Sequence, residues 1–186
     1  MTEGDNVRVA VRCRPMSSEE ILTSCKPCVH ANEKTKTVRF SRSQSQHSAD
    51  HTFMFDNVYD QYSIQSKIYE ESCKTIVDGV MRGFNGTIYA YGQTGTGKTY
   101  TMEGTKDQPG IIPLSFEHIF SSISSENSHK RYLVSVSYLE IDNENIRDRD
   151  DNQVSFENTS ALSHQTEFNP GTWIPSSLDS TICNLC

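Results

Sequence analysis

A single glycine-rich segment carries most of the chemistry that this chain could perform. Residues 92–99 read Gly-Gln-Thr-Gly-Thr-Gly-Lys-Thr and match the pattern G-x-x-x-x-G-K-[ST] at every fixed position. Glycines allow a backbone to turn tightly and to point its N–H groups at a phosphate, and the N-terminus of a following helix adds the positive end of its dipole. The segment therefore predicts a site for nucleotide phosphates.

The residue types within this segment predict separate roles. The ammonium group of Lys98 would bridge the β- and γ-phosphates, and the hydroxyl of Thr99 would be a ligand of Mg²⁺. A chance glycine turn is the alternative, and it is disfavoured because every fixed position matches and an apolar run leads directly into the segment. The predicted phosphate-binding residues are Gly92, Gln93, Thr94, Gly95, Thr96, Gly97, Lys98 and Thr99.

The segments on either side of the loop are of the kind that would position it. Gly86–Tyr91 is a short apolar run typical of a buried strand. Before it, apolar residues recur at helical spacing from Ile64 to Met81, with Ser63 as the expected N-cap and Gly83 as the expected end. After the loop, Pro113–Ile123 is expected to be a helix with proline in its first turn. This succession of helix, strand, glycine loop and helix predicts an α/β fold.

Further strands are expected on both sides of this central part. Apolar and β-branched residues predict short strands at Val7–Arg12, Thr37–Phe40 and Thr52–Phe55, and alternation predicts a long strand at Tyr132–Ile141. Ser41–Ser48 is polar and of low complexity, so we expect it to be a solvated loop.

Composition limits the classes of protein to which the chain could belong. Of its 186 residues, 34% are hydrophobic, and the net charge is -7. The charge argues against a nucleic-acid partner, and the lack of an apolar run of about 18 residues argues against a membrane span. The N-terminus is acidic and has no apolar stretch of the kind found in signal peptides, so we expect reduced cysteines and a cytoplasmic location.

The distribution of charge predicts a boundary near residue 150. All 17 basic residues lie between Arg8 and Arg149, whereas the last 37 residues contain five acidic residues and no basic one. Beyond Asp150 the apolar residues follow neither the helical nor the strand period. We therefore expect residues 6–150 to belong to one domain and residues 151–186 to be a disordered polar tail, with a second small domain as the disfavoured alternative.

The wider context of the loop resembles the kinesin motor domain. Residues 91–102 follow the form Y-G-Q-T-G-x-G-K-T-x-T-M, which is highly specific among phosphate-loop proteins. Four other segments resemble kinesin motifs in the same order and at similar spacing, namely Val11–Pro15 (R-x-R-P), Phe53–Tyr59 (F-x-F-D-x-V-F), Gly110–Pro113 (G-I-I-P) and Ser137–Ile141 (S-Y-x-E-I). The sequences R-C-R-P at residues 12–15 and G-Q-T-G-T-G-K-T at residues 92–99 are most similar to those of the intraflagellar-transport kinesins.

The resemblance implies a fold, an activity and further site residues. It implies a three-layer αβα arrangement around a mostly parallel or mixed central sheet, present here in incomplete form. It implies hydrolysis of ATP with Mg²⁺, coupled to movement on microtubules, in the cytoplasm and cytoskeleton and in the cilium for the intraflagellar group. Arg12, Arg14 and Pro15 match the family residues that flank the adenine. Tyr100 matches a ring near the base, and a core aromatic is the equal alternative for it.

The chain also departs from the family pattern. Asp142 stands where the family has tyrosine, and Arg149 and Asp150 stand where it has paired leucines. The switch motifs N-x-x-S-S-R-S-H and D-L-A-G-S-E, which sense the γ-phosphate, do not occur in the sequence. We therefore expect residues 6–150 to be a partial motor domain that alone has no microtubule-stimulated ATPase activity and folds only in part.

Three functions remain as hypotheses at this point. The first is the ATP-binding part of a microtubule motor. The second is a truncated, non-motile product that binds nucleotide or has no function. The third is a small nucleotide kinase, which is disfavoured because such enzymes carry the phosphate loop near the N-terminus, whereas here it begins at Gly92.

Overall fold

The computed structural model describes residues 7–41, 50–126, 132–136, 139–142, 145–148, 156–157 and 181–185. The chain forms two compact units, one made of Met1–Ile119 with Pro175–Cys186 and the other of Phe120–Ile174. The first unit contains the glycine-rich loop and every other residue that the sequence predicts for the site. Residues 42–48 of the predicted Ser41–Ser48 loop lie outside the described residues.

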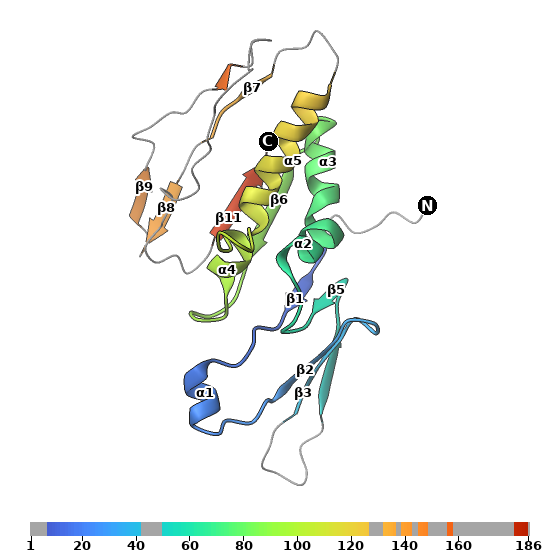
Figure 1. Cartoon of the computed structure of the whole chain (residues 1–186), viewed down its shortest axis with the longest axis vertical. Helices are drawn as coiled ribbons and strands as arrows, with labels where there is room; N and C mark the ends of the chain where they lie inside the picture. The colour runs from blue at the N-terminus through green and yellow to red at the C-terminus, as the bar shows by residue number, and fades with distance from the viewer. Residues whose placement is uncertain are drawn as a thin grey trace. The chain divides into compact units, whose positions relative to one another are not determined.

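The strands at the start of the chain form two small sheets. One sheet pairs β1 and β5 in parallel, with Val11 opposite Val58, and the other is antiparallel in the order β2-β3-β4 (Figure 1). The predicted strands at 7–12, 37–40 and 52–55 are therefore confirmed to within a few residues. Their bounds are β1 Ala10–Arg12, β2 Val29–Asn32, β3 Thr37–Phe40, β4 His51–Met54 and β5 Asn57–Tyr59, and a short helix, α1 Ser18–Leu22, lies between β1 and β2.

The predicted helix before the loop is confirmed as a nearly continuous helical segment. It consists of α2 (Gln65–Ile68), a π-helical turn η1 (Tyr69–Cys73) and α3 (Lys74–Met81). Gly83 has a φ of +95° and donates its N–H to the carbonyl of Val80 at 2.8 Å. The helix therefore ends where the sequence predicts, because glycine adopts this left-handed conformation without a steric cost.

The N-cap predicted for this helix is wrong. Ile64 occupies the N-cap position, where no side chain makes a capping hydrogen bond. The hydroxyl of Ser63 instead donates to Glu33 at 2.5 Å and to Asp60 at 3.1 Å. Glu33 also accepts a hydrogen bond from Lys67 at 2.6 Å. The Ser63 hydroxyl therefore donates to Glu33, which lies between β2 and β3, and does not cap the helix. The two residues are 30 positions apart in the chain.

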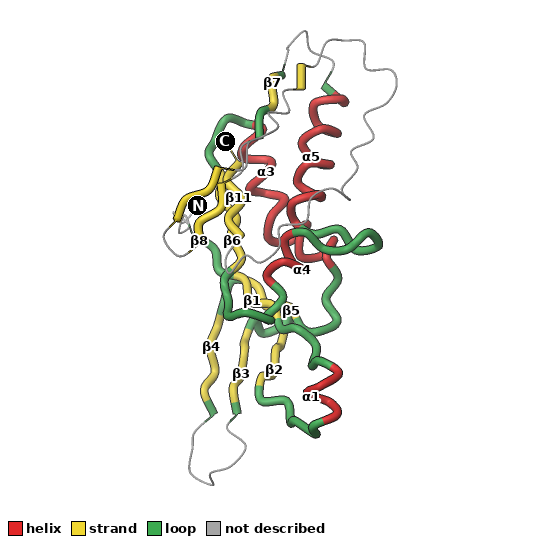
Figure 2. Tube along the Cα trace, turned by 90° about the vertical axis from the view of Figure 1, so that its left-hand side faces the viewer, coloured by secondary structure: helices red, strands yellow, loops and turns green. Residues whose placement is uncertain are grey.

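The elements around the loop enclose the main hydrophobic core. They are β6 (Gly86–Ala90), α4 (Lys98–Met102) and α5 (Ile111–Ser125), and the last contains the predicted helix at 113–123 with Pro113 in its first turn. The buried side chains of the core come from η1, α3, α4 and the start of α5, with Ile88 and Ala90 of β6 packed against them, and they are Tyr69, Cys73, Val77, Met102 and Ile111. Figure 2 shows α3 and α4 beside β6.

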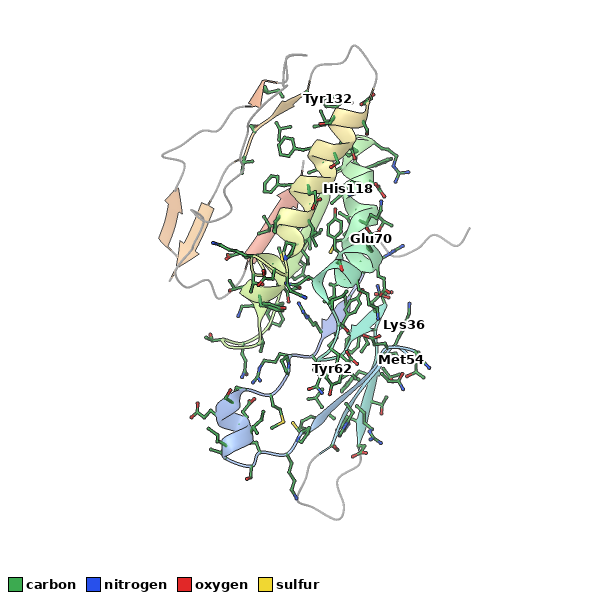
Figure 3. The ribbon with its side chains drawn as sticks, viewed as in Figure 1. Lys36, Met54, Tyr62, Glu70, His118 and Tyr132 are labelled. Atoms are coloured by element: carbon green, nitrogen blue, oxygen red, sulfur yellow. The ribbon has the colours of Figure 1, made fainter. Side chains whose placement is uncertain are left out.

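A polar link joins α3 to α5 next to this core. The hydroxyl of Tyr69 lies 2.9 Å from Nδ1 of His118, and Nε2 of His118 lies 3.1 Å from a carboxylate oxygen of Asp78. His118 is labelled on α5 in Figure 3. The imidazole therefore contacts groups from both ends of the η1–α3 segment.

The strand that leads into the loop is exposed on one face, which the sequence did not predict. Ile88 and Ala90 of β6 pack against the helices, but Tyr89 is 64% exposed. Along its edge, β6 pairs in antiparallel with β11 (Thr181–Leu185), with Thr181 opposite Ala90. The strand is confirmed, but the expectation that it is buried is wrong for the face of Tyr89, because the described residues cover only the face of Ile88 and Ala90.

The second unit contains short antiparallel pairs. β7 (Leu133–Val134) pairs with β10 (Phe156–Glu157), and β8 (Leu139–Asp142) pairs with β9 (Asn145–Asp148). Residues 135–136 lie between β7 and β8 and belong to no strand. The single long strand predicted at 132–141 is therefore wrong, because its two halves pair with different partners. The predicted boundary near residue 150 stays a prediction.

Two methionines test the contribution of the core. Met102 is fully buried and Met54, labelled in Figure 3, is 77% exposed. Met102→Ala should lower the free energy of unfolding by about 2–5 kcal/mol, because it leaves a cavity between α4 and α3. Met54→Ala should change it by less than about 0.5 kcal/mol. Urea denaturation measures both values, and equal effects would contradict this description of the core.

The Glu33 contacts predict a pH dependence of stability. Hydrogen bonds from Lys67 and Ser63 lower the pKa of Glu33 from 4.5 to about 2. Because the pKa is lower in the folded state, the stabilisation is fully present above about pH 4.5 and is lost as the pH falls towards 2. Thermal melts between pH 6 and pH 2.5 should therefore show a smaller loss of Tm for Glu33→Gln than for the wild type. Glu19→Gln, at an exposed position, serves as the control and should follow the wild type; parallel profiles for all three proteins would refute the prediction.

Candidate nucleotide-phosphate site

The predicted loop lies between β6 and α4, in the strand–loop–helix order that the sequence indicates. Gly95 and Gly97 have φ values of +83° and +93°, and Gly97 is the N-cap residue of α4. Thr96 donates to the carbonyl of Gln93 through its N–H at 3.2 Å and through its hydroxyl at 2.8 Å. The loop is therefore closed by its own hydrogen bonds and turns at two residues where glycine alone is unstrained.

Lys98 lies at the start of α4 and reaches back across the loop. Its side chain is buried, with 7% of its surface exposed, and its ammonium group donates to the carbonyl of Gly92 at 2.6 Å. A carbonyl is a neutral acceptor, so an incoming phosphate competes favourably for the ammonium group by offering a charge-assisted hydrogen bond. The position of Lys98 thus fits the role predicted for it.

The surroundings of the loop bear on how Mg²⁺ could be held. Thr99 follows Lys98 and is exposed, as are Gln93 and Thr94. Within the part of the chain that the structure describes, no group of three or more His, Cys, Asp or Glu side chains could hold a metal ion. Mg²⁺ usually keeps several waters and binds through one or two protein groups and the phosphates. A single hydroxyl at Thr99 fits that form of binding.

Arg12 lies at the end of β1 and makes contacts with two distant helices. Its guanidinium group donates to Gln65 Oε1 at 2.6 Å, to Thr101 Oγ1 at 3.0 Å and to the carbonyl of Ser63 at 3.3 Å. The same group lies 4.9 Å from the centroid of the Tyr100 ring, which is a cation–π distance. Burial lowers the pKa of Arg12 from its usual value. The structure thus brings Arg12 and Tyr100 together, one residue beyond Thr99.

Arg14 and Pro15 follow in the loop after β1. The guanidinium group of Arg14 makes two hydrogen bonds with the carboxylate of Glu20, at 2.8 and 2.7 Å, and a third with the carbonyl of Pro15 at 2.9 Å. The hydrogen bonds from Arg14 and from the backbone of Ser17 lower the pKa of Glu20 to about 2. These contacts fix Arg14 against α1, whereas Arg12 is fixed against α2 and α4.

Sequence reasoning missed two residues of this arrangement. Gln65 is only 4% exposed, and Thr101 lies in α4 three residues after Lys98; both accept hydrogen bonds from Arg12. A polar residue at a buried position of the predicted helix was the one available signal for Gln65. Thr101 is a fixed position of the K-T-x-T-M pattern, but the pattern gave it no role, because its partner lies 89 residues away in the chain.

Two glycines test the backbone of the loop. A Cβ atom added to Gly97 or to Gly79 would meet no heavy atom within 4 Å, so the two positions differ mainly in backbone conformation. Gly97→Ala should lower the free energy of unfolding by about 1 kcal/mol, because alanine is strained at a φ of +93°. Gly79→Ala, inside α3, should raise it by about 0.5–1 kcal/mol. Chemical denaturation of both variants provides the measurement, and changes of the same sign would argue against the loop conformation.

Comparisons with known proteins agree on one family. The kinesin motor domain family matches residues 12–172. The kinesin-like protein klp-20 of Caenorhabditis elegans is 46% identical over 151 residues, which cover 80% of this chain and 23% of the relative. The kinesin-like protein KIF3C of Bos taurus is 45% identical over 146 residues, which cover 76% of this chain and 18% of the relative. The chain thus spans less than a quarter of the length of these relatives.

A solved structure shows the same relationship in three dimensions. The structure of a fast kinesin superposes with a TM-score of 0.68 and 40% sequence identity, over 76% of this chain and 40% of the other. The described residues combine parallel and antiparallel strand pairs with helices, as expected for part of this α/β fold. The predicted fold class is confirmed by this likeness. This chain belongs to the kinesin motor-domain family.

Proposed function

We propose that this chain is the nucleotide-binding part of a microtubule-based motor that hydrolyses ATP. The observation that carries the proposal is the complete G-x-x-x-x-G-K-T loop between β6 and α4 in a member of the kinesin motor-domain family. The ammonium group of Lys98 reaches across this loop to the carbonyl of Gly92. In the whole protein, ATP hydrolysis would be coupled to movement along microtubules.

The phosphate side of the site would be formed by residues 92–99. Backbone N–H groups of the glycine-rich turn would surround the β-phosphate, and Lys98 would leave the carbonyl of Gly92 to contact the β- and γ-phosphates. The Thr99 hydroxyl would hold Mg²⁺, which neutralises charge on the phosphate oxygens when it is bound. Positioning and electrostatic stabilisation supply most of the catalysis in phosphoryl transfer, so these residues would do their part by fixing the phosphates.

The base side of the site would be formed around Tyr100. Tyr100 is 40% exposed, and the guanidinium group of Arg12 lies 4.9 Å from the centroid of its ring, so the residue would be accessible to a base. Arg14 and Pro15 continue from β1 and would flank the adenine, as the family resemblance implies. ADP would occupy the same site after hydrolysis.

The proposed partner and location follow from the family. Microtubules would be the partner, and the protein would be found with the cytoskeleton in the cytoplasm. The resemblance to intraflagellar-transport kinesins adds the cilium as a proposed location. None of the helices in the described ranges is both long enough and apolar enough to cross a lipid bilayer.

Replacing Lys98 tests the proposal. Lys98→Ala should weaken binding of ATP with Mg²⁺ by at least about tenfold, the loss expected for one hydrogen bond between charged groups. Lys106→Ala removes an exposed lysine eight residues further along and should leave the affinity unchanged. Fluorescence or calorimetric titration of the purified chain gives both dissociation constants.

The result of this titration decides the nucleotide part of the proposal. Equal affinities for the wild type and Lys98→Ala would show that the loop is not the phosphate site. In the whole protein, the same substitution should abolish ATP turnover that polymerised tubulin accelerates, and turnover that persists would contradict the motor function.

A further inference from the structure

Gln65 is a buried polar residue at the first position of α2. Only 4% of its surface is exposed, and it lies between the end of β1 and the backbone of α4. A buried amide is costly unless its oxygen and its nitrogen both find partners. In this chain both do, and each partner belongs to a different segment of the proposed nucleotide site.

The two partners fix the orientation of the Gln65 amide. Its Oε1 accepts a hydrogen bond from Nη1 of Arg12 at 2.6 Å, and its Nε2 donates to the backbone carbonyl of Tyr100. A guanidinium group can only donate and a carbonyl can only accept, so the reverse orientation of the amide would lose both hydrogen bonds. Gln65 therefore acts as a bridge between Arg12 and Tyr100.

This bridge bears on the position of the Tyr100 ring. α4 has only five residues, so it depends on contacts with other elements for a fixed position. Gln65 holds the main chain at Tyr100, while Arg12 lies against the ring at 4.9 Å and also donates to Thr101. Both the backbone and the ring of Tyr100 are thus constrained by a network in which Gln65 is the shared member.

We propose that Gln65 is a positioning residue for nucleobase recognition, which holds Arg12 and Tyr100 in the arrangement that receives the base of the nucleotide. This inference rests on the proposed function. It assigns Gln65 no contact with the phosphates, because two hydrogen bonds that shape the loop, Thr96 to Gln93 and Lys98 to Gly92, do not involve it. Gln65 therefore affects the base side of the site and leaves the phosphate side unchanged.

Two ligands distinguish an effect on the base side of the site from an effect on the phosphate side. The first is ATP with Mg²⁺, and the second is inorganic tripolyphosphate with Mg²⁺, which has the phosphates but no base. Gln65→Ala should weaken ATP binding by about tenfold, because it leaves Arg12 and the Tyr100 carbonyl without their shared partner. Tripolyphosphate binding should change by less than about twofold. Gln61→Ala, at an exposed position four residues earlier, is the matched control and should change neither affinity.

A second variant tests whether Gln65 acts through Arg12. The double variant Arg12→Ala/Gln65→Ala should bind ATP no more weakly than the weaker of the two single variants, because both changes break the same network. Additive losses would show that Gln65 and Arg12 act independently and would overturn the inference.

The two ligands also distinguish this inference from a general effect on folding and from the proposed function itself. If Gln65→Ala weakens both ligands equally, Gln65 only stabilises the fold; if it weakens neither, it has no role at the site, and either result overturns the inference. If the wild-type chain binds neither ligand, the proposed function fails, and the inference fails with it.

Discussion

The guanidinium group of Arg12 is the contact on which the arrangement of the site depends. It joins the end of β1 to α2 through Gln65 and to the segment before α2 through the carbonyl of Ser63. It also joins β1 to α4 through Thr101 and the ring of Tyr100. These partners lie 51 to 89 residues away in the chain. A guanidinium group has five donors in a fixed plane, and its flat face can lie against an aromatic ring at the same time. The ammonium group of lysine has three donors and no such face. One charged side chain thus determines how three separate elements meet beside the loop.

The hydrophobic core supports this polar network from the other side of α4. Met102 is fully buried at the end of α4, against Val77 of α3 and Ile111 of α5. Thr101 and Met102 are neighbours, so the helix offers a polar residue to Arg12 and an apolar one to the core within a single turn. Because α4 is too short to be stable alone, burial of Met102 and the contacts of Arg12 together hold the residues that follow the phosphate loop.

The sequence predicted those features of the candidate site that depend on residues close together in the chain. The turn at Gly95 and Gly97 and the helix end at Gly83 follow from residue type alone, because each needs a positive φ. The N-cap at Ser63 was predicted wrongly because a carboxylate 30 residues earlier takes its hydroxyl. Gln65 could not be assigned, since its two partners lie 53 and 35 residues away and only the folded chain brings them together.

The proposed site has two parts, which differ in how far apart in the chain their contacting residues lie. They therefore differ in how much they depend on the packing of distant elements. On the phosphate side, the contacts of Thr96 and Lys98 span three and six residues, so this part is determined by the chain between β6 and α4. On the proposed base side, the contacts of Arg12 and Gln65 join residues that are 35 to 89 positions apart in the chain. Local structure forms at a lower entropic cost than contacts between distant segments. Under the proposed function, loosening of the fold would therefore disturb base recognition before it disturbs phosphate binding. Discrimination between nucleobases would then be the more sensitive measure of whether β1, α2 and α4 are correctly packed.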